Sequence, residues 1–206
     1  MTTHKLHCFK ESGNSYKVAL ALSIAGLPWE KVVVDYFGGE TRQPAWRAEV
    51  NELGEVPVLE VEGRKLSQSG VILLHLADHV SALSLSEEER PEALRWLLFD
   101  NHKFTANLAT YRWLRTFAAP APHEAVLAFI RQRIGGAFDI VEKHLGQQRF
   151  IVGDRLTIAD LSLAGYVFYP KEELGFDISA EYPNLSAWMR RIAQTPGWQA
   201  PYELLG

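Results

Sequence analysis

Two segments of the sequence contain residues that could together hold an extended peptide. The first is the Val56-Pro57 step: because proline cannot donate to a β-ladder, it marks the start of a strand and leaves the backbone edge of Val56 free. A peptide can pair with such an edge as an added strand. The second is Gln68-Ser69, which stands just before the N-terminus of a predicted apolar helix. Unpaired N–H groups and the helix dipole favour a carboxylate at that end. Either element alone is more typical of a capped strand or helix without a ligand, but the two together predict a peptide site.

A third segment could supply chemistry to that peptide. Ser12-Gly13-Asn14-Ser15 follows the first predicted strand and contains only residues suited to a turn and a helix N-cap. Taken alone, it predicts a cap and nothing more. Ligands of α/β units, however, collect at the carboxyl ends of parallel strands, which is where we expect Ser12. A thiol in the bound peptide would then lie near the Ser12 hydroxyl.

The Ser12 hydroxyl is sufficient to activate such a thiol. An ordinary thiol has a pKa of about 8.5, and lowering it by ~2 units requires ~2.7 kcal/mol of preferential stabilisation of the thiolate. One hydrogen bond to a charged acceptor supplies ~1.5–3 kcal/mol, and a helix N-terminus adds ~0.3–1 kcal/mol. No general base is needed, because the thiolate is itself the nucleophile.

Cysteine and histidine are weaker candidates for chemistry in this chain. The single cysteine, Cys8, falls inside the first predicted strand, so we expect a buried and unreactive thiol. One cysteine cannot form an intrachain disulfide, and the seven histidines show no ligand spacing that would predict a metal. His102 could approach a cleft, although a solvated or helix-packed ring is the commoner role. We therefore expect a protein of the reducing cytoplasm that holds no metal.

The elements that must position these residues change character along the chain. Residues 1–80 alternate between strand and helix patterns, with strands expected at 6–9, 30–36, 58–61 and 65–66, helices at 16–25 and from 71 onward, and an irregular helix at 42–50. The order βαβ-α-ββα predicts a mixed four-stranded sheet with a parallel pair and a right-handed crossover.

The rest of the chain has a helical pattern. Residues 81–86 are expected to form a linker, and 87–206 an all-helical domain with helices beginning after the linker, at 124–145, after Thr157 and at Pro183. Thr157 and Asp160 have the spacing of a capping box, so Asp160 is interpreted as a structural cap rather than a catalytic acid.

Composition and charge exclude several classes of protein. Apolar residues make up 47% and charged residues 22% of the 206 residues, which is typical of a globular chain and argues against disorder. The formal net charge of −4 provides no basic field for phosphates, so nucleic acid and anionic membrane surfaces are not expected partners. No apolar run reaches the ~18 residues of a membrane span, and no export signal is recognised at the N-terminus.

Four fragments in order resemble the cytosolic glutathione transferases, and the resemblance covers nearly the whole chain. Residues 12–18 look like the active-site loop of bacterial members related to the theta, zeta and nu classes, and 51–59 look like the segment that bears the family's cis-proline. Gln68-Ser69 is similar to the pair that holds the γ-glutamyl group, and 154–160 to the capping motif of the helical domain. The resemblance implies a thioredoxin-like N-terminal domain at 1–80 and a helical bundle at 87–206.

Site residues carried over from this resemblance form a glutathione site. Ser12 would donate to the glutathione sulfur, with Asn14 as a second polar contact. The glutathione-binding residues implied are Gln43, Glu55, Val56, Pro57, Gln68 and Ser69. Gln43 is assigned to the glycyl end and Val56 to the cysteinyl backbone. Two positions depart from the family pattern, since Glu55 stands where many members have a basic residue or glutamine, and Gln68 replaces the commoner glutamate.

The resemblance also implies a substrate and a partner. Glutathione would be the co-substrate, its thiolate would attack a small apolar electrophile in detoxification, and the chain would form a homodimer. Tyr111, Trp113 and Tyr169 are the candidates for the electrophile pocket, although aromatic residues at helical spacing more often belong to the core. Two alternatives stay open: glutathione-dependent reduction of disulfides or peroxides, and a non-catalytic relative that serves as a binding or assembly module.

Overall fold

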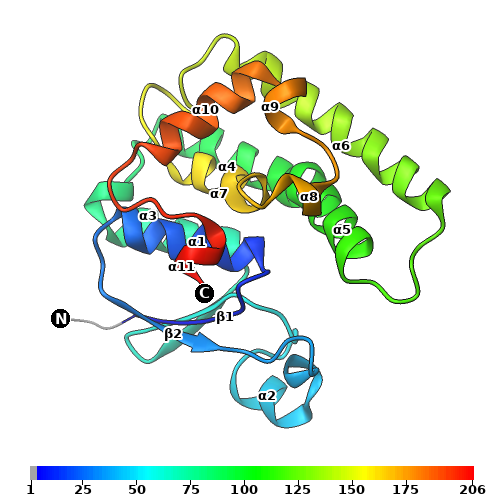
Figure 1. Ribbon diagram of the computed structural model, residues 1–206. Coiled ribbons are helices and arrows are strands. Elements are labelled where there is room, and N and C mark those ends of the chain that lie inside the picture. Colours follow the sequence, from blue (N-terminus) through cyan, green and yellow to red (C-terminus); the bar gives the residue numbers. More distant parts are fainter. Residues whose placement is uncertain (1–3) are drawn as a thin grey trace. The chain divides into compact units, whose positions relative to one another are not determined.

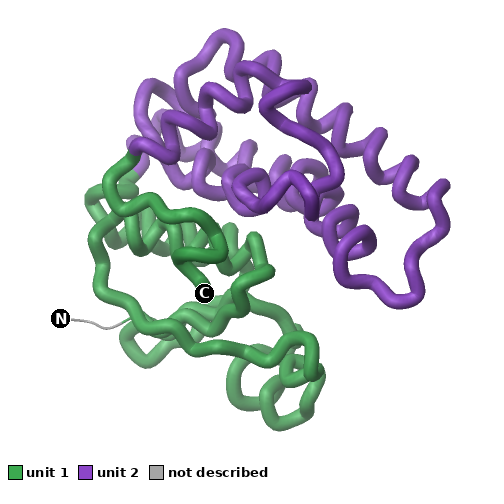
Figure 2. Tube along the Cα trace, in the orientation of Figure 1, with its two compact units in different colours: residues 1–84, 195–206 green, residues 85–194 purple. Residues whose placement is uncertain are grey.

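The computed structural model describes residues 4–206, in which strands alternate with helices up to Ser67 and helices follow (Figure 1). The described chain divides into two units (Figure 2). Unit 1 contains the chain up to Ser84 together with Thr195–Gly206, and unit 2 is Leu85–Gln194. No helix of residues 4–206 is both long and apolar enough to cross a membrane.

Unit 1 is built on a mixed four-stranded sheet with the strand order β2-β1-β3-β4. The strands are β1 (His4–Cys8), β2 (Trp29–Val33), β3 (Val58–Val61) and β4 (Arg64–Ser67). β1 pairs parallel with β2 and antiparallel with β3, and β3 pairs antiparallel with β4. The predicted thioredoxin-like sheet with one parallel pair is therefore confirmed.

Helices lie on both sides of this sheet (Figure 1). α1 (Gly13–Ile24) and α3 (Ser69–His79) pack against each other on one side, while α2 (Pro44–Glu49), preceded by the 3-10 helix Glu40–Arg42, lies on the other. Leu6 and Leu59 are opposite each other in the register and fully buried. Burial of such side chains is the main source of stability for the unit.

Residues 195–206 return to unit 1, and we call this segment the C-terminal strap. It contains α11 (Pro201–Leu204). The Tyr16 hydroxyl donates to the Gln199 carbonyl at 2.7 Å, and the Ser23 hydroxyl donates to the Gly197 carbonyl at 2.6 Å. The expectation that all of 87–206 belongs to the helical domain thus differs from the structure at its end, because these hydrogen bonds tie the strap to α1.

Unit 2 consists of helices. They are α4 (Glu89–Phe99), a π-helical turn (Asp100–Phe104), α5 (Thr105–Thr116), α6 (Glu124–Leu145), α7 (Ile158–Val167), α8 (Lys171–Leu174), α9 (Ile178–Glu181) and α10 (Pro183–Ala193). The expected linker at 81–86 begins with a 3-10 helix, Ser81–Leu83, in which Leu83 is buried.

Asp160 is the buried cap of α7. Its carboxylate accepts hydrogen bonds from the backbone N–H and the hydroxyl of Thr157, from the Ile151 N–H and from the Trp188 indole N–H, at 2.8–3.0 Å. These donors come from three segments of unit 2, so one carboxylate holds α7, α10 and the loop before α7 together. The predicted structural role of Asp160 is confirmed.

Candidate functional site

Ser12 caps the N-terminus of α1 at the carboxyl end of β1. Its backbone is extended, with φ −84° and ψ 105°, and its hydroxyl oxygen accepts a hydrogen bond from the Ser15 N–H at 3.1 Å. The Ser12 side chain is buried, with an exposed fraction of 4%. Because the cap uses the hydroxyl as an acceptor, its proton remains able to donate.

Asn14 and Ser69 bring the N-termini of α1 and α3 together. The Ser69 hydroxyl lies 3.5 Å from the Asn14 side-chain oxygen. Asn14 is in the first turn of α1 and Ser69 is the first residue of α3. Each helix carries partial positive charge at this end, so two fields that favour an anion meet at one place in unit 1.

Gln68 adds a side-chain amide beside Ser69. Its Nε2 donates to the Glu55 carboxylate at 2.8 Å, and both side chains are exposed. The backbone of Gln68 has φ +68°, a conformation that side chains rarely adopt. Such conformations persist only where surrounding contacts hold them, and they cluster at ligand sites.

The loop before β3 carries the Val56-Pro57 step. Its peptide bond is cis. Asn51 braces this loop, because its side-chain amide donates to the Glu55 carbonyl at 2.8 Å while its side-chain oxygen accepts from the Leu53 N–H. The ladder of β3 starts at Val58, so Val56 lies outside the observed pairing. Sequence reasoning missed Asn51, although an Asn at the first position of a turn is a recognisable signal for this role.

Gln43 lies between the 3-10 helix and α2. Its side chain is exposed and makes no hydrogen bond within residues 4–206. Ser12 and Asn14 therefore lie at the start of α1, where Asn14 contacts Ser69. Gln68, next to Ser69 in the chain, bonds to Glu55, whereas the Gln43 side chain makes no hydrogen bond to any of these residues.

The three aromatic candidates for an electrophile pocket all lie in unit 2. Tyr111 and Tyr169 are buried, with exposed fractions of 6% and 3%, and Trp113 is partly exposed. The Arg112 guanidinium lies 3.8 Å from the centre of the Tyr169 ring and donates to Glu173 at 2.8 Å. Tyr169 thus packs in a buried cluster with Arg112 and Glu173. The spacing of aromatic residues in the sequence could not predict this cluster.

Cys8 has no exposed surface, and burial raises the pKa of its thiol to about 12, although nearby Lys31 opposes the shift. A thiol with this pKa is not a nucleophile at neutral pH. The prediction that Cys8 is buried is confirmed, and the raised pKa agrees with the expected lack of reactivity.

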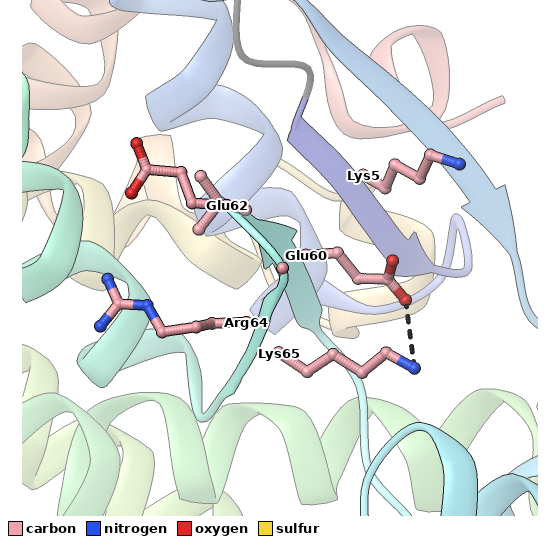
Figure 3. A pocket seen from close by; sticks show the side chains of 7 residues that line it. Lys5, Glu60, Glu62, Arg64 and Lys65 are labelled. Carbon is pink, nitrogen blue, oxygen red and sulfur yellow. Dashed lines mark ion pairs between the residues drawn. The ribbon is translucent and has the colours of Figure 1, made fainter.

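The structure contains depressions apart from these residues. One, of about 170 Å³, is lined by Lys5 and residues 60–65 at the β3–β4 hairpin, where Lys65 pairs with Glu60 at 3.5 Å (Figure 3). Another, of about 280 Å³, is lined in unit 2 by residues between Val167 and Ser179 and by Met189. Among residues 4–206, no group of three or more histidine, cysteine or acidic side chains is arranged to hold a metal.

Comparison with known families matches both parts of the chain. The glutathione S-transferase N-terminal domain matches residues 4–78, and the glutathione S-transferase C-terminal domain matches residues 124–191. The chain is 30% identical to a maleylacetoacetate isomerase from Pseudomonas aeruginosa over 92% of this chain and 89% of that protein. It is 26% identical to glutathione S-transferase F14 from Arabidopsis thaliana over 94% of this chain and 80% of that protein. The chain belongs to the glutathione S-transferase family.

Solved structures agree with this assignment. A possible glutathione S-transferase from Rhodopseudomonas palustris has a TM-score of 0.87 at 35% identity and covers 96% of this chain and 89% of its own. Ure2p, solved in complex with glutathione, has the same fold, with a TM-score of 0.85 at 24% identity over 94% of this chain and 95% of its own.

Proposed function

We propose that this protein is a glutathione transferase in which Ser12 holds the glutathione sulfur as a thiolate for attack on an apolar electrophile. Membership of the family supports transferase activity in general. The single observation that carries the specific proposal is the meeting of two helix N-termini, marked by Ser69 and Asn14, beside the capping hydroxyl of Ser12.

The reaction needs little from the protein beyond charge stabilisation. The thiol loses its proton to solvent, and the Ser12 hydroxyl donates to the resulting thiolate. The sulfur then forms a bond to an electrophilic carbon, and the leaving group departs with the electron pair of the broken bond. A hydrogen bond to the thiolate is worth about 1.5–3 kcal/mol, which favours the anion at neutral pH.

The remaining site residues have assigned roles in this proposal. Val56, beside Pro57, pairs with the cysteinyl backbone, Gln68 and Ser69 bind the γ-glutamyl amine and carboxylate, and Gln43 serves the glycyl end. Glu55 supports Gln68. Tyr111, Trp113 and Tyr169 are kept as the candidates for contact with the electrophile, and Trp113 is the one of them that is partly exposed.

We further propose a cytoplasmic homodimer of the theta, zeta or nu-like bacterial type with a role in detoxification. Domains are assigned to 1–80 and 87–194 around the linker, with the C-terminal strap added to the first.

Three alternatives use the same fold, two of them catalytic. The similarity to a protein named maleylacetoacetate isomerase favours isomerisation as a second activity of this site. Reduction of a mixed disulfide would instead have the thiolate attack sulfur. A non-catalytic module would bind glutathione without either reaction, or not bind it at all.

The test begins with binding and then compares variants. The protein is applied to immobilised glutathione; failure to bind contradicts the proposal and favours the assembly module. Conjugation of a chlorinated nitroaromatic, isomerisation of maleylacetoacetate and reduction of a mixed disulfide are then measured with Ser12→Ala and Ser12→Gly. Glycine caps a helix nearly as well as serine, so Ser12→Gly removes the hydroxyl with little effect on α1.

Both variants are expected to shift the pH at which conjugation is half-maximal upward by about 1–2 units, which corresponds to the loss of one charged hydrogen bond. Ser15→Ala, which removes a neighbouring hydroxyl from the same helix, is the control and should retain the wild-type profile. Unchanged profiles for both Ser12 variants would remove Ser12 from its proposed role.

A further inference from the structure

Two histidines on α3 lie outside the site described above. His75 and His79 are separated by four residues, and their ring centres are 4.2 Å apart with an interplanar angle of 32°. Residues at this spacing are neighbours on one face of a helix. The sequence analysis found no ligand spacing among the histidines, but the observed extent of α3 through His79 places these two rings side by side.

The hydrogen bond of His79 fixes which of its nitrogens is available. Its Nδ1 lies 2.8 Å from the His75 backbone carbonyl, which can only accept, so Nδ1 carries the proton. The lone pair is therefore on Nε2. Histidines that bind metals commonly orient themselves in this way, by donating the other ring N–H to a backbone carbonyl or a carboxylate.

Charged groups surround the His75 ring. The guanidinium of Arg64 and the carboxylates of Glu62 and Asp78 are all close enough to act on it. Figure 3 shows that Glu62 and Arg64 extend from the β3–β4 hairpin on the side away from Lys5 and Lys65.

Other histidines of the described chain are placed differently. His7 pairs with Glu60 at 2.8 Å, His144 lies 3.0 Å from the Ile151 carbonyl, and the His123 ring accepts from the Ala125 N–H. None of these contacts brings two imidazoles together.

We infer that His75 and His79 chelate a divalent first-row transition ion through ring nitrogens, with water completing the coordination. Imidazole suits zinc, copper and nickel, whereas magnesium and calcium require oxygen ligands. The described chain offers no third ligand arranged around the pair, so the ion would be exchangeable and partly open to solvent. Glu62 and Asp78 would offset part of its charge without binding it directly.

Calorimetric titration of the full-length protein, first treated with a chelator and exchanged into clean buffer, tests this inference. Cu²⁺, Ni²⁺, Zn²⁺ and Mg²⁺ are titrated separately. One transition ion is expected to bind per chain, with Cu²⁺ the tightest of the four and no heat of binding for Mg²⁺. Replacing a residue that only supports a metal ligand costs about 10–100-fold in metal affinity. Removing a ligand itself should cost at least as much, so His75→Ala and His79→Ala should each bind the ion at least tenfold more weakly.

His102→Ala is the matched control, because His102 is an exposed histidine in unit 2, and it should bind metal as the wild type does. His79→Gln keeps a good helix former at this position and should lose affinity like His79→Ala. The electron paramagnetic resonance spectrum of bound Cu²⁺ should show two nitrogen ligands in the wild type and one in either alanine variant. The inference is wrong if no transition ion binds saturably, or if the His75 and His79 variants bind as tightly as the control. Neither readout depends on glutathione.

Discussion

The Gln68 side-chain amide donates to the carboxylate of Glu55 at 2.8 Å, and this hydrogen bond connects the start of α3 to the loop before β3. The backbone carbonyl of Gln68 also accepts from the Ile72 N–H at 3.0 Å, which opens α3. With its NH₂ group turned toward Glu55, the amide oxygen of Gln68 is left to accept a hydrogen bond from a ligand. In the proposed function, Glu55 therefore positions the Gln68 amide and does not itself contact the ligand.

Glu55→Ala should weaken glutathione binding and leave the rate at saturating substrate nearly unchanged. The lost hydrogen bond is exposed, so its contribution is about 1 kcal/mol, or roughly fivefold in affinity. Isothermal titration with glutathione and a comparison of KM with kcat measure the effect. Glu52→Ala, an exposed glutamate on the same loop, is the control. Equal affinities in the two variants would contradict the positioning role of Glu55.

Gly197→Ala should detach the C-terminal strap from α1. Gly197 has φ +85°, and an added Cβ would lie 2.5 Å from the Ser23 carbonyl oxygen. Gly26→Ala is the matched control, since Gly26 also has a positive φ, +66°, but a Cβ added there would meet no atom within 4 Å. Both variants should lose about 1 kcal/mol from the backbone conformation.

Only Gly197→Ala should also expose the strap. Hydrogen exchange followed by mass spectrometry is expected to show faster exchange for residues 195–206 in that variant than in Gly26→Ala. Similar exchange in both would mean that the close approach of Gly197 to Ser23 does not hold the strap in place.

Much of the fold could be predicted because its signals are local. The strand at Val58–Val61 and the helix at Glu124–Leu145 were expected with the bounds that the structure shows, since proline precedes the strand and glycine follows the helix. The cap at Asp160 was predictable for the same reason, as its spacing from Thr157 is a short-range pattern.

Long-range contacts had no such signal. The strap is attached through the backbone carbonyls of Gly197 and Gln199, and a carbonyl acceptor is present at every residue, so no residue type indicates it. The His75 and His79 rings are a different case: the sequence analysis found no ligand spacing among the histidines, and the 4.2 Å approach of these two rings depends on α3 continuing through His79.

Asp160→Ala should destabilise unit 2 severely. The change leaves the Ile151 N–H, the Thr157 N–H and the Trp188 indole N–H without their acceptor in a buried position. Each buried unsatisfied donor costs about 1–3 kcal/mol, so a loss of about 3–5 kcal/mol in the free energy of unfolding is expected. Urea denaturation measures it, with the exposed Asp139→Ala on α6 as the control. A loss below about 1 kcal/mol would show that these donors find other partners.

Cys8 should make the protein less stable as the pH rises above 9. Burial raises the pKa of the Cys8 thiol from the reference value of 9.0 for the unfolded chain to about 12 in the folded chain. Between these values the unfolded chain loses the thiol proton while the folded chain keeps it, so the free energy of unfolding falls with pH. The thiol's contribution is complete below pH 9, is reduced by about 1.4 kcal/mol at pH 10, and continues to fall until the folded thiol ionises near pH 12.

Urea denaturation of the wild type and of Cys8→Ala at pH 8 and pH 10 isolates this contribution, because lysine and tyrosine titrate in both proteins. The wild type should lose more stability than the variant between the two pH values, and parallel losses would mean that the Cys8 thiol ionises as readily in the folded chain as in the unfolded one.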